Sequence, residues 1–237
     1  MKLIIPYRLK SERFPKKYIS DFLGRPLVEH SIKLCQGLGD VIVTAPREDY
    51  VKEVSDLHSK YKFDFIPTSL DCRCGTDRVI EISKRFVDDF YVMIPADEPL
   101  IDRNELKRVL SSELDDFNLC YCDFYCEEDC TSNLSAKIVS TYDDYLLYLS
   151  RNIIPIKKNG EFDYKDCKKC VAIKIYSYWG IKELYDKETK LDNIESLEEL
   201  KMVELGQRVK LHKINHIGFG IDIPEQVKLL EDRYCGN

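Results

Sequence analysis

The sequence predicts an α/β fold, in which helices cover the faces of a largely parallel sheet. Short apolar runs alternate with helix-like segments about every 20 residues through the first third of the chain, as in strands joined by crossover helices. The chain has 237 residues, which suits one large domain or one domain that carries a subdomain. We therefore expect residues 1–237 to form a single domain.

The first strand is expected at residues 3–5, directly before Pro6, because proline ends strand pairing. Residues 27–38 are expected to be helical, since Val28, Ile32 and Cys35 share one helical face. The same criteria predict strands at 41–43, 63–66 and 90–94, and helices at 48–60 and 103–114. A further helix is expected to open within residues 71–78, and its inner face is expected to comprise Val79, Ile82, Phe86 and Val87.

The pattern changes after residue 117. Strands are expected at 117–125, 136–140, 145–150 and 171–178, with few helices between them. We therefore expect residues 122–185 to contain an inserted β-rich subdomain. Its Tyr, Cys and Ile content suits a subunit interface, and a simple extension of the sheet is the alternative. A helix at 194–205, a strand at 209–214 and a last helix at 224–230 complete the chain.

The composition excludes several classes of function. The net charge is −6 and the pI about 5.4, so binding along a nucleic acid is not expected. No apolar run approaches the roughly 18 residues of a membrane span, and the run at 3–5 is too short for a signal peptide. We expect a cytoplasmic protein without a membrane span.

Ten cysteines in such a chain predict free thiols in a reducing compartment. The alternative is a zinc site built from two groups: Cys120, Cys122, Cys126 and Cys130, and Cys167 and Cys170. However, Cys120, Cys122, Phe124 and Cys126 alternate as one buried face of a strand would. We therefore expect no zinc.

A basic loop follows the first strand. It contains five cations and a serine within ten residues: Arg8, Lys10, Ser11, Arg13, Lys16 and Lys17. The carboxyl end of a strand is where open α/β sheets bind ligands, and clustered cations suit a polyanion such as a nucleoside triphosphate. A solvated, lysine-rich surface loop is the alternative.

Two further segments follow predicted strands. Gly75 permits another group to approach the backbone closely, and Thr76 can cap a helix. The N-terminus of a helix that follows a glycine is also suited to binding an anion or the edge of a base. An ordinary capped helix start explains the same residues. Asp97 and Glu98 follow the strand at 90–94, a position where carboxylates hold Mg²⁺ on a phosphate. Asp97 is the better candidate ligand.

Five segments, in order along nearly the whole chain, resemble one family. RLKSERFPKK (8–17) resembles the phosphate loop RxxSxRxPxK of the sugar-acid cytidylyltransferases, and CGTDR (74–78) resembles that family's SGTER. ADEPLI (96–101), LYLSRNIIPI (147–156) and GFGIDIPEQV (218–227) resemble GDEPMI, LYFSRxxIP and GxGVDTPEDL. The last two point to the branch that activates 3-deoxy-manno-octulosonate (Kdo), the CMP-Kdo synthetases.

The resemblance implies a three-layer nucleotide-diphospho-sugar-transferase fold, with helices on both faces of a mixed sheet, an inserted β-rich dimerisation subdomain and usually a homodimer. It implies a Mg²⁺-dependent reaction between CTP and an acidic sugar, which gives a CMP-sugar and pyrophosphate. The anomeric hydroxyl attacks the α-phosphorus, so the protein must align these groups and neutralise the charge that grows on the phosphate oxygens.

The motif matches also imply roles for individual residues. The nucleotide-binding set is Arg8, Ser11, Arg13, Lys17, Gly75, Thr76 and Arg78. In this set Arg8 and Lys17 would grip the triphosphate, and the last three would lie beside cytosine and ribose. Asp97 and Asp222 would carry Mg²⁺, which makes Lys17, Arg8 and Asp97 the implied catalytic residues. Arg151, Tyr176, Glu198 and Glu199 fall at sugar-side positions.

Four positions depart from the family pattern. Lys16 replaces a glycine of the phosphate loop, so its backbone path is expected to differ. The other three are sugar-side positions: Pro95 replaces a glutamine, Ala172 the histidine before GIYGY, and Glu199 the glutamine of EQLR. A carboxylate at Glu199 would pair with an ammonium group, so an amino-modified Kdo (8-amino-Kdo) is an alternative substrate, unless Glu199 faces solvent. A nonulosonic acid of the sialic-acid type and a degenerate nucleotide-binding homologue are further alternatives.

Overall fold

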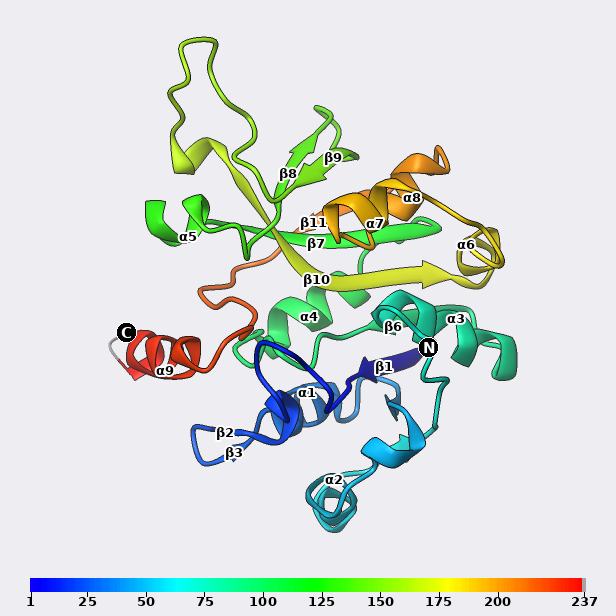
Figure 1. The fold of residues 1–237 in the computed structure, drawn as a ribbon. Coiled ribbons are helices and arrows are strands. Elements are labelled where there is room, and N and C mark those ends of the chain that lie inside the picture. The colour runs from blue at the N-terminus through cyan, green and yellow to red at the C-terminus, as the bar shows by residue number, and fades with distance from the viewer. Residues whose placement is uncertain (236–237) are drawn as a thin grey trace. The chain divides into compact units, whose positions relative to one another are not determined.

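The computed structural model describes residues 1–235 and divides into two units (Figure 1). The first unit comprises Met1–Arg103 and the chain from Gly218 onwards, and the second comprises Asn104–Ile217. The predicted single domain and the predicted bounds of an inserted subdomain stay predictions. No helix among residues 1–235 is both long and apolar enough to cross a membrane.

A parallel sheet lies at the centre of the first unit. Its strands are β1 (Lys2–Pro6), β4 (Asp40–Thr44), β5 (Asp64–Phe65) and β6 (Phe90–Met93), in the order β6-β1-β4-β5. The register pairs Ile4 of β1 with Ile42 on one side and with Met93 on the other. Leu3, Ile4 and Ile5 are completely buried, which explains why β1 is a continuous apolar run, as strands covered on both faces are.

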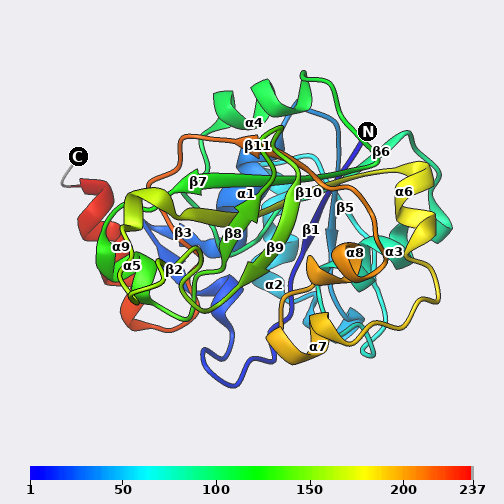
Figure 2. The same ribbon diagram turned by 90° about the horizontal axis from the view of Figure 1, so that it is seen from above.

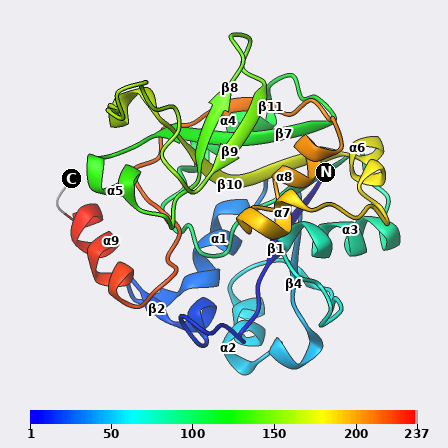
Figure 3. The same cartoon turned by 45° about the horizontal axis from the view of Figure 1, so that its top comes forward.

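Two of the three connections between these strands contain a helix of more than two turns. Helix α1 (Leu27–Cys35) lies between β1 and β4 along the chain, and α3 (Gly75–Arg85) lies between β5 and β6. From β1 the chain adds β4 and then β5 on one side of β1. It then crosses back over the sheet, and β6 pairs with the other side of β1. Because such connections are right-handed, α1 and α3 cover opposite faces of the sheet (Figure 3).

The rest of the first unit surrounds this sheet. It contains the hairpin β2 (Asp21–Phe22) and β3 (Arg25–Pro26), helices α2 (Lys52–Ser55) and α9 (Glu225–Cys235), and 3₁₀ turns at Lys17–Ile19, Arg47–Asp49 and Asp56–Ser59. A cluster of Phe22, Leu27, Phe219, Ile221 and Leu230 packs the segment from Gly218 onwards against the region around α1. Residues that follow position 217 thereby become part of the N-terminal fold.

The second unit is built on longer, mostly antiparallel strands (Figure 2). Strand β7 (Phe117–Asp123) pairs antiparallel with β10 (Lys168–Ser177) and parallel with β11 (Lys210–Lys213). Strands β8 (Lys137–Ser140) and β9 (Leu146–Ser150) form an antiparallel pair, and β8 continues onto the start of β10. The helical elements are α4 (Arg103–Leu110), which begins at the unit boundary, α5 (Glu127–Thr131), a 3₁₀ turn at Tyr164–Asp166, α6 (Tyr178–Glu183), α7 (Leu191–Glu195) and α8 (Leu200–Glu204).

Every predicted strand is present, with ends shifted by a few residues, whereas two predicted helices are wrong. The helix expected at 48–60 is interrupted at Val51, whose backbone is extended, and becomes α2 flanked by two 3₁₀ turns. The helix expected at 194–205 is interrupted at Ser196, which adopts a left-handed conformation with φ 53° between α7 and α8.

Burial differs from the predictions at two places. Val87 was expected on the inner face of α3, but the helix ends at Arg85 and the side chain of Val87 is 73% exposed. Strand β7 was expected to bury one face, on the alternation of its cysteines. Cys120 and Cys122 are buried, but Tyr121 between them is buried as well, so β7 is covered on both faces.

Candidate active site

The basic loop and Asp97 lie at the carboxyl ends of two adjacent strands. The loop leaves β1 at Pro6, and Asp97 follows the end of β6, which pairs with β1 in parallel. The direction of the connections reverses between these two strands, because β4 lies on the other side of β1. Such a switch point is where open α/β sheets bind ligands.

Lys17 lies between two carboxylates at this point. Its Nζ donates a hydrogen bond of 2.7 Å to Oδ2 of Asp97 and lies 3.7 Å from Oδ1 of Asp222. Only 7% of the Lys17 side chain is exposed, whereas Arg8, Lys10, Arg13 and Lys16 are exposed. The alternative of a solvated surface loop therefore describes four of these five cations, but not Lys17.

Asp222 reaches the site from the segment that follows residue 217. The amide of Ile221 donates to the carbonyl oxygen of Asp97 at 2.9 Å, which fixes the two acidic residues to each other through the backbone. Oε1 of Gln226, in the first turn of α9, accepts from the amide of Asp222 at 2.6 Å. Arg13 adds an ion pair of 3.1 Å to Oδ1 of Asp222.

The electrostatics keep Lys17 protonated and the neighbouring Tyr18 neutral. Burial on its own lowers the pKa of Lys17, but the charge of Asp97, its hydrogen bond to Lys17 and the charge of Asp222 together with Tyr18 outweigh this effect, and the pKa is raised above its ordinary value. Burial and the charge of Asp97 both raise the pKa of Tyr18. The Tyr18 ring lies beneath the ammonium, with Nζ of Lys17 4.9 Å from the ring centroid, a favourable cation–π arrangement.

The phosphate-loop backbone is left-handed at Lys16. Lys16 has φ 59° and ψ 21°, in the left-handed region, which glycine adopts more easily than any other residue. The lysine therefore holds a conformation that glycine favours, and whether the loop path differs from that of the family stays a prediction. The amide of Lys16 donates to the carbonyl oxygen of Leu9 at 2.9 Å, which closes the loop.

The segment at the start of α3 contains three predicted nucleotide-binding residues. A Cβ atom at Gly75 would lie 2.6 Å from Sδ of Met93, so the glycine backbone packs closely against this side chain; its approach to a nucleotide stays a prediction. Thr76 does not cap the helix, because α3 begins at Gly75 with Cys74 at the N-cap. Arg78 is buried and donates to Oγ1 of Thr68 at 2.6 Å and to the carbonyl oxygen of Ser69 at 3.1 Å.

In the second unit, Arg151 binds backbone carbonyl groups. Its guanidinium donates to the carbonyl oxygens of Asn133, Leu134, Glu195 and Ser196 at 3.1–3.3 Å. These bonds hold the residues before β8 and the residues after α7 against the end of β9. No carboxylate accepts from Arg151 in these bonds, and one N–H of the five remains for another partner.

Lys174 in β10 is a buried cation that pairs with two consecutive glutamates. Its side chain is 1% exposed, its Nζ bonds to Oε1 of Glu198, and it lies 2.8 Å from Oε1 of Glu199. Burial alone would lower the pKa of Lys174, but the charges of Glu198 and Glu199 outweigh this and raise the pKa well above its ordinary value. Glu199 is 6% exposed, so the alternative in which it faces solvent is wrong.

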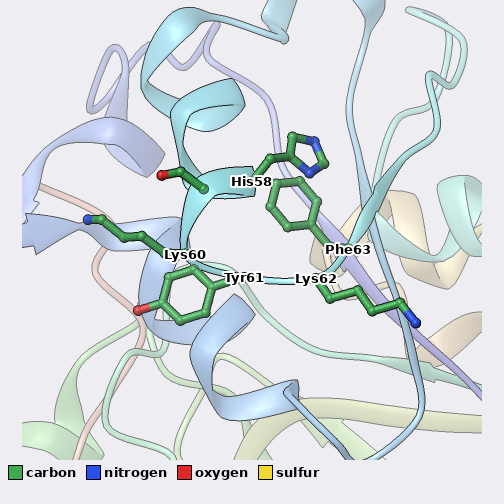
Figure 4. A pocket seen from close by; sticks show the side chains of 6 residues that line it. His58, Lys60, Tyr61, Lys62 and Phe63 are labelled. Atoms are coloured by element: carbon green, nitrogen blue, oxygen red, sulfur yellow. The ribbon is translucent and has the colours of Figure 1, made fainter.

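A separate hollow in the first unit contains none of the predicted site residues. It is lined by His58, Ser59, Lys60, Tyr61, Lys62 and Phe63 (Figure 4). The rings of His58 and Phe63 stack at 3.9 Å, and Tyr61 donates to Glu29 at 3.0 Å. The polar ends of Lys60 and Tyr61 point away from the stacked rings.

A family model described as "Cytidylyltransferase" matches residues 3–214. The chain belongs to the cytidylyltransferase family. A 3-deoxy-manno-octulosonate cytidylyltransferase of a Nitratiruptor species is 30% identical over 240 residues, which cover 95% of this chain and 96% of that protein. The enzyme of the same description from Haemophilus influenzae (strain 86-028NP) is 27% identical and covers 95% of both chains.

Solved structures show the same fold. The structure of a CMP:2-keto-3-deoxy-manno-octonic acid synthetase complexed with CTP has a TM-score of 0.83 at 22% identity, covering 99% of this chain and 98% of that chain. A putative glucose-1-phosphate thymidylyltransferase from Bacillus anthracis has a TM-score of 0.70 at 11% identity, covering 98% and 94%. The predicted fold class and the predicted nucleotidyltransferase activity are thus confirmed, while a dimerisation subdomain stays a prediction.

The first unit of this cytidylyltransferase offers donors that fit Mg²⁺. Asp97 and Asp222 both lie within reach of one ammonium group, so one metal ion could reach both. Mg²⁺ is commonly held by one or two carboxylates together with phosphate oxygens, rather than by a complete protein cage. Among residues 1–235, no group of three or more His, Cys, Asp or Glu side chains is placed to hold a metal ion.

The structure brings some predicted residues together and reveals one that the sequence analysis missed. Arg13, Lys17, Asp97 and Asp222 form one cluster, whereas Arg8 is exposed and Ser11 accepts a bond of 3.4 Å from the amide of Phe14 within the loop. Tyr176 is completely buried, its ring edge-on to Phe117. Lys174 was missed, although a single lysine within the apolar run VAIKIY (171–176) was a usable signal.

The cysteines of this cytidylyltransferase are all free thiols, as predicted. Cys130 and Cys167, one from each group considered for zinc, are buried together with Phe124. Burial raises the pKa of the Cys130 thiol to about 12, so this thiol stays protonated and unreactive. The expected lack of zinc stays a prediction.

Proposed function

We propose that this cytidylyltransferase transfers CMP from CTP to the anomeric hydroxyl of Kdo or a closely related 3-deoxy-ulosonic acid. The observation that carries the proposal is the buried Lys17 between Asp97 and Asp222 at the ends of β1 and β6. The names of the relatives from Nitratiruptor and Haemophilus support the choice of sugar acid. We propose a cytoplasmic enzyme and a homodimer on the family resemblance alone.

The basic loop would bind the triphosphate. Arg8 and Arg13 are exposed, so their charges can attract an anion from solvent, and Arg can bind two oxygens at once. Lys17 Nζ carries three donors, of which the short bond to Asp97 uses one. The remaining donors allow Lys17 to bind phosphate oxygens without leaving Asp97.

Lys17 would act as a fixed cation and not as a base. Its raised pKa keeps the proton on Nζ throughout the ordinary pH range, so the ammonium can stabilise the charge that grows on the phosphate oxygens in the transition state. Pyrophosphate leaves as the anomeric oxygen bonds to the α-phosphorus. When bound, Mg²⁺ would be held by Asp97 and Asp222 and would supply further positive charge at the phosphates.

The unmodified acid is preferred over an amino-modified one because of Lys174. The amino-sugar alternative assumed that Glu199 needs an ammonium partner from the substrate. In the structure Lys174 provides that ammonium at 2.8 Å, which removes the reason to assign it to the substrate. A nonulosonic acid of the sialic-acid type remains the second choice within the same reaction.

The test is a screen of sugar acids with CTP and Mg²⁺, in which released pyrophosphate and the mass of the CMP-sugar are measured. We expect the highest kcat/KM with Kdo, lower values with nonulosonic acids and none with neutral sugars. Lys17→Met should abolish the signal, and Lys10→Met, an exposed cation of the same loop, should retain it. If the parent forms no CMP-sugar with any ulosonic acid, the proposed function is wrong.

A further inference from the structure

Lys174 is placed by an irregularity in β10. The register of β10 against β7 shifts between Val171 and Lys174, so that Val171 pairs with Cys120 and Lys174 with the adjacent Leu119. Residues 172 and 173 form the bulge. Bulges redirect side chains and occur frequently beside functional sites. The bulge includes Ala172, where the family pattern has a histidine.

The partner glutamates are fixed from the other side. Arg151 donates to the carbonyl oxygens of Glu195 at 3.3 Å and of Ser196 at 3.1 Å, which holds the left-handed turn at Ser196 that precedes Glu198 and Glu199. Arg151, directly after β9, and Lys174, within β10, therefore hold one short segment. Two residues assigned to the sugar side by resemblance, Arg151 and Glu198, are joined by this segment.

The stability of the fold does not explain a buried lysine with two glutamates. Replacing a buried ion pair with apolar residues is often neutral or stabilising. The contrast with Lys137 is informative, since Lys137 is also completely buried but donates to three backbone carbonyl groups, those of Ser132, Ser135 and Arg151. Lys137 organises backbone, whereas Lys174 controls two side-chain carboxylates, one of which, Glu198, is 19% exposed.

We infer that Lys174 is a positioning and specificity-determining residue of the sugar side. Lys174 neutralises Glu199 and orients Glu198. A single net negative charge is thereby presented at the partly exposed carboxylate of Glu198. This inference rests on the proposed function, because resemblance places Glu198 at the sugar. Glu198 would then accept hydrogen bonds from the hydroxyl groups of the sugar acid.

The charge of the cluster sets the preference between a neutral and a cationic sugar tail. With Lys174 and both glutamates ionised, the net charge is −1. Glu199→Gln would make it zero, which disfavours an ammonium-bearing substrate relative to a hydroxyl-bearing one. Lys174→Met would remove the positive charge and leave two carboxylates, which favours the ammonium-bearing substrate. The preference for the ammonium-bearing substrate over the hydroxyl-bearing one should therefore be lowest in Glu199→Gln, intermediate in the parent and highest in Lys174→Met.

The experiment compares kcat and KM for Kdo and for its 8-amino analogue in the parent, Lys174→Met, Lys174→Arg and Glu199→Gln. We expect the KM of Lys174→Met for Kdo to rise by at least about tenfold, because Glu198 loses the charged hydrogen-bond partner that orients it. The KM for CTP should be unchanged. The amino-to-hydroxyl ratio of kcat/KM should rise about tenfold in Lys174→Met and fall in Glu199→Gln, and Lys174→Arg should restore the parent ratio. Lys168→Met is the matched control, because Lys168 lies on the same strand and pairs with Asp144 at 3.4 Å.

The outcomes separate this inference from the proposed function. If the parent converts no Kdo-type acid, the proposed function fails. If the parent converts Kdo and the ratio is the same in Lys174→Met and Glu199→Gln, only the role of Lys174 is refuted. Circular dichroism and the thermal midpoint check folding; should Lys174→Met not fold, the ratio in Glu199→Gln decides, and an unchanged ratio there overturns the inference.

Discussion

The two units use their charged residues in different ways. In the first unit, Lys17, Asp97 and Asp222 meet at strand ends, and both carboxylates keep about a quarter of their side-chain surface exposed. In the second unit, Arg151 and Lys174 are bound by their own chain, to backbone carbonyls and to two glutamates. The first arrangement leaves charge available for a ligand, and the second uses charge to shape a segment. Substitutions in the first unit should therefore reduce turnover, and those in the second should reduce stability and sugar affinity.

The largest effect is expected at Asp97. Asp97→Asn removes a proposed Mg²⁺ ligand and the charge partner of Lys17, so turnover should fall by at least about a hundredfold while the fold stays intact. Steady-state kinetics with CTP and Kdo, together with the thermal midpoint, measure this. Asp64→Asn, an exposed position on β5, is the control. Near-normal turnover of Asp97→Asn would show that the metal assignment is wrong.

The next effect separates Lys17 from the other lysines of its loop. Lys17→Met should cost roughly 2.7–4 kcal/mol of transition-state stabilisation, the range for losing a donor aimed at developing charge. Lys10→Met and Lys16→Met should each have a much smaller effect, because both side chains are exposed. The comparison is made on kcat/KM for CTP in all three variants. Equal, small losses in all three would support a solvated loop.

The proposed nucleotide-binding part of the site could be predicted from the sequence because its residues follow strand ends. Parallel strands bring their carboxyl ends to one edge of the sheet, so Lys17 and Asp97 could be placed together from sequence alone. Asp222 needed the resemblance, since no periodicity indicates that the chain from Gly218 onwards returns to β6. The break at Ser196 in the helix predicted at 194–205 could not be predicted from the local sequence pattern. Arg151 and Lys174, which are distant in sequence, stabilise that turn.

The role of Lys174 was missed for a related reason. A lysine in an apolar strand shows that a partner is needed, but the partner is chosen by tertiary structure. Glu199 was interpreted as a substrate contact because its neighbour on β10 could not be known from sequence. Thr76 shows the limit of local sequence patterns, since the helix begins two residues earlier than its predicted capping role required.

A third prediction tests whether the cations of the second unit support the fold. Arg151→Met leaves four backbone carbonyl groups without their donor. The bonds to Asn133 and Ser196 are exposed, so water can replace them, whereas those to Leu134 and Glu195 are partly buried, and a buried acceptor left unsatisfied costs about 1–3 kcal/mol. We expect a loss of about 2 kcal/mol in the free energy of unfolding, measured in urea. Arg13→Met, which removes one exposed ion pair to Asp222, should change the same quantity by less than about 1 kcal/mol. Equal effects of the two substitutions would remove the distinction between the units.

The smallest effect is expected at Lys16, where backbone strain can be separated from charge. A left-handed conformation costs a non-glycine residue about 1–2 kcal/mol, and Lys16 adopts it with φ 59°. Glycine removes that strain, but its more flexible unfolded state opposes folding by about 0.5–1 kcal/mol. Lys16→Gly should therefore stabilise the protein by up to about 1 kcal/mol, seen as a higher thermal midpoint. Lys10→Gly, in the same loop but without positive φ, should lower the midpoint slightly, since there glycine adds only the entropic cost. If Lys16→Gly lowers the midpoint as much as Lys10→Gly does, the lysine side chain contributes to the fold and strain is not the dominant effect at this position.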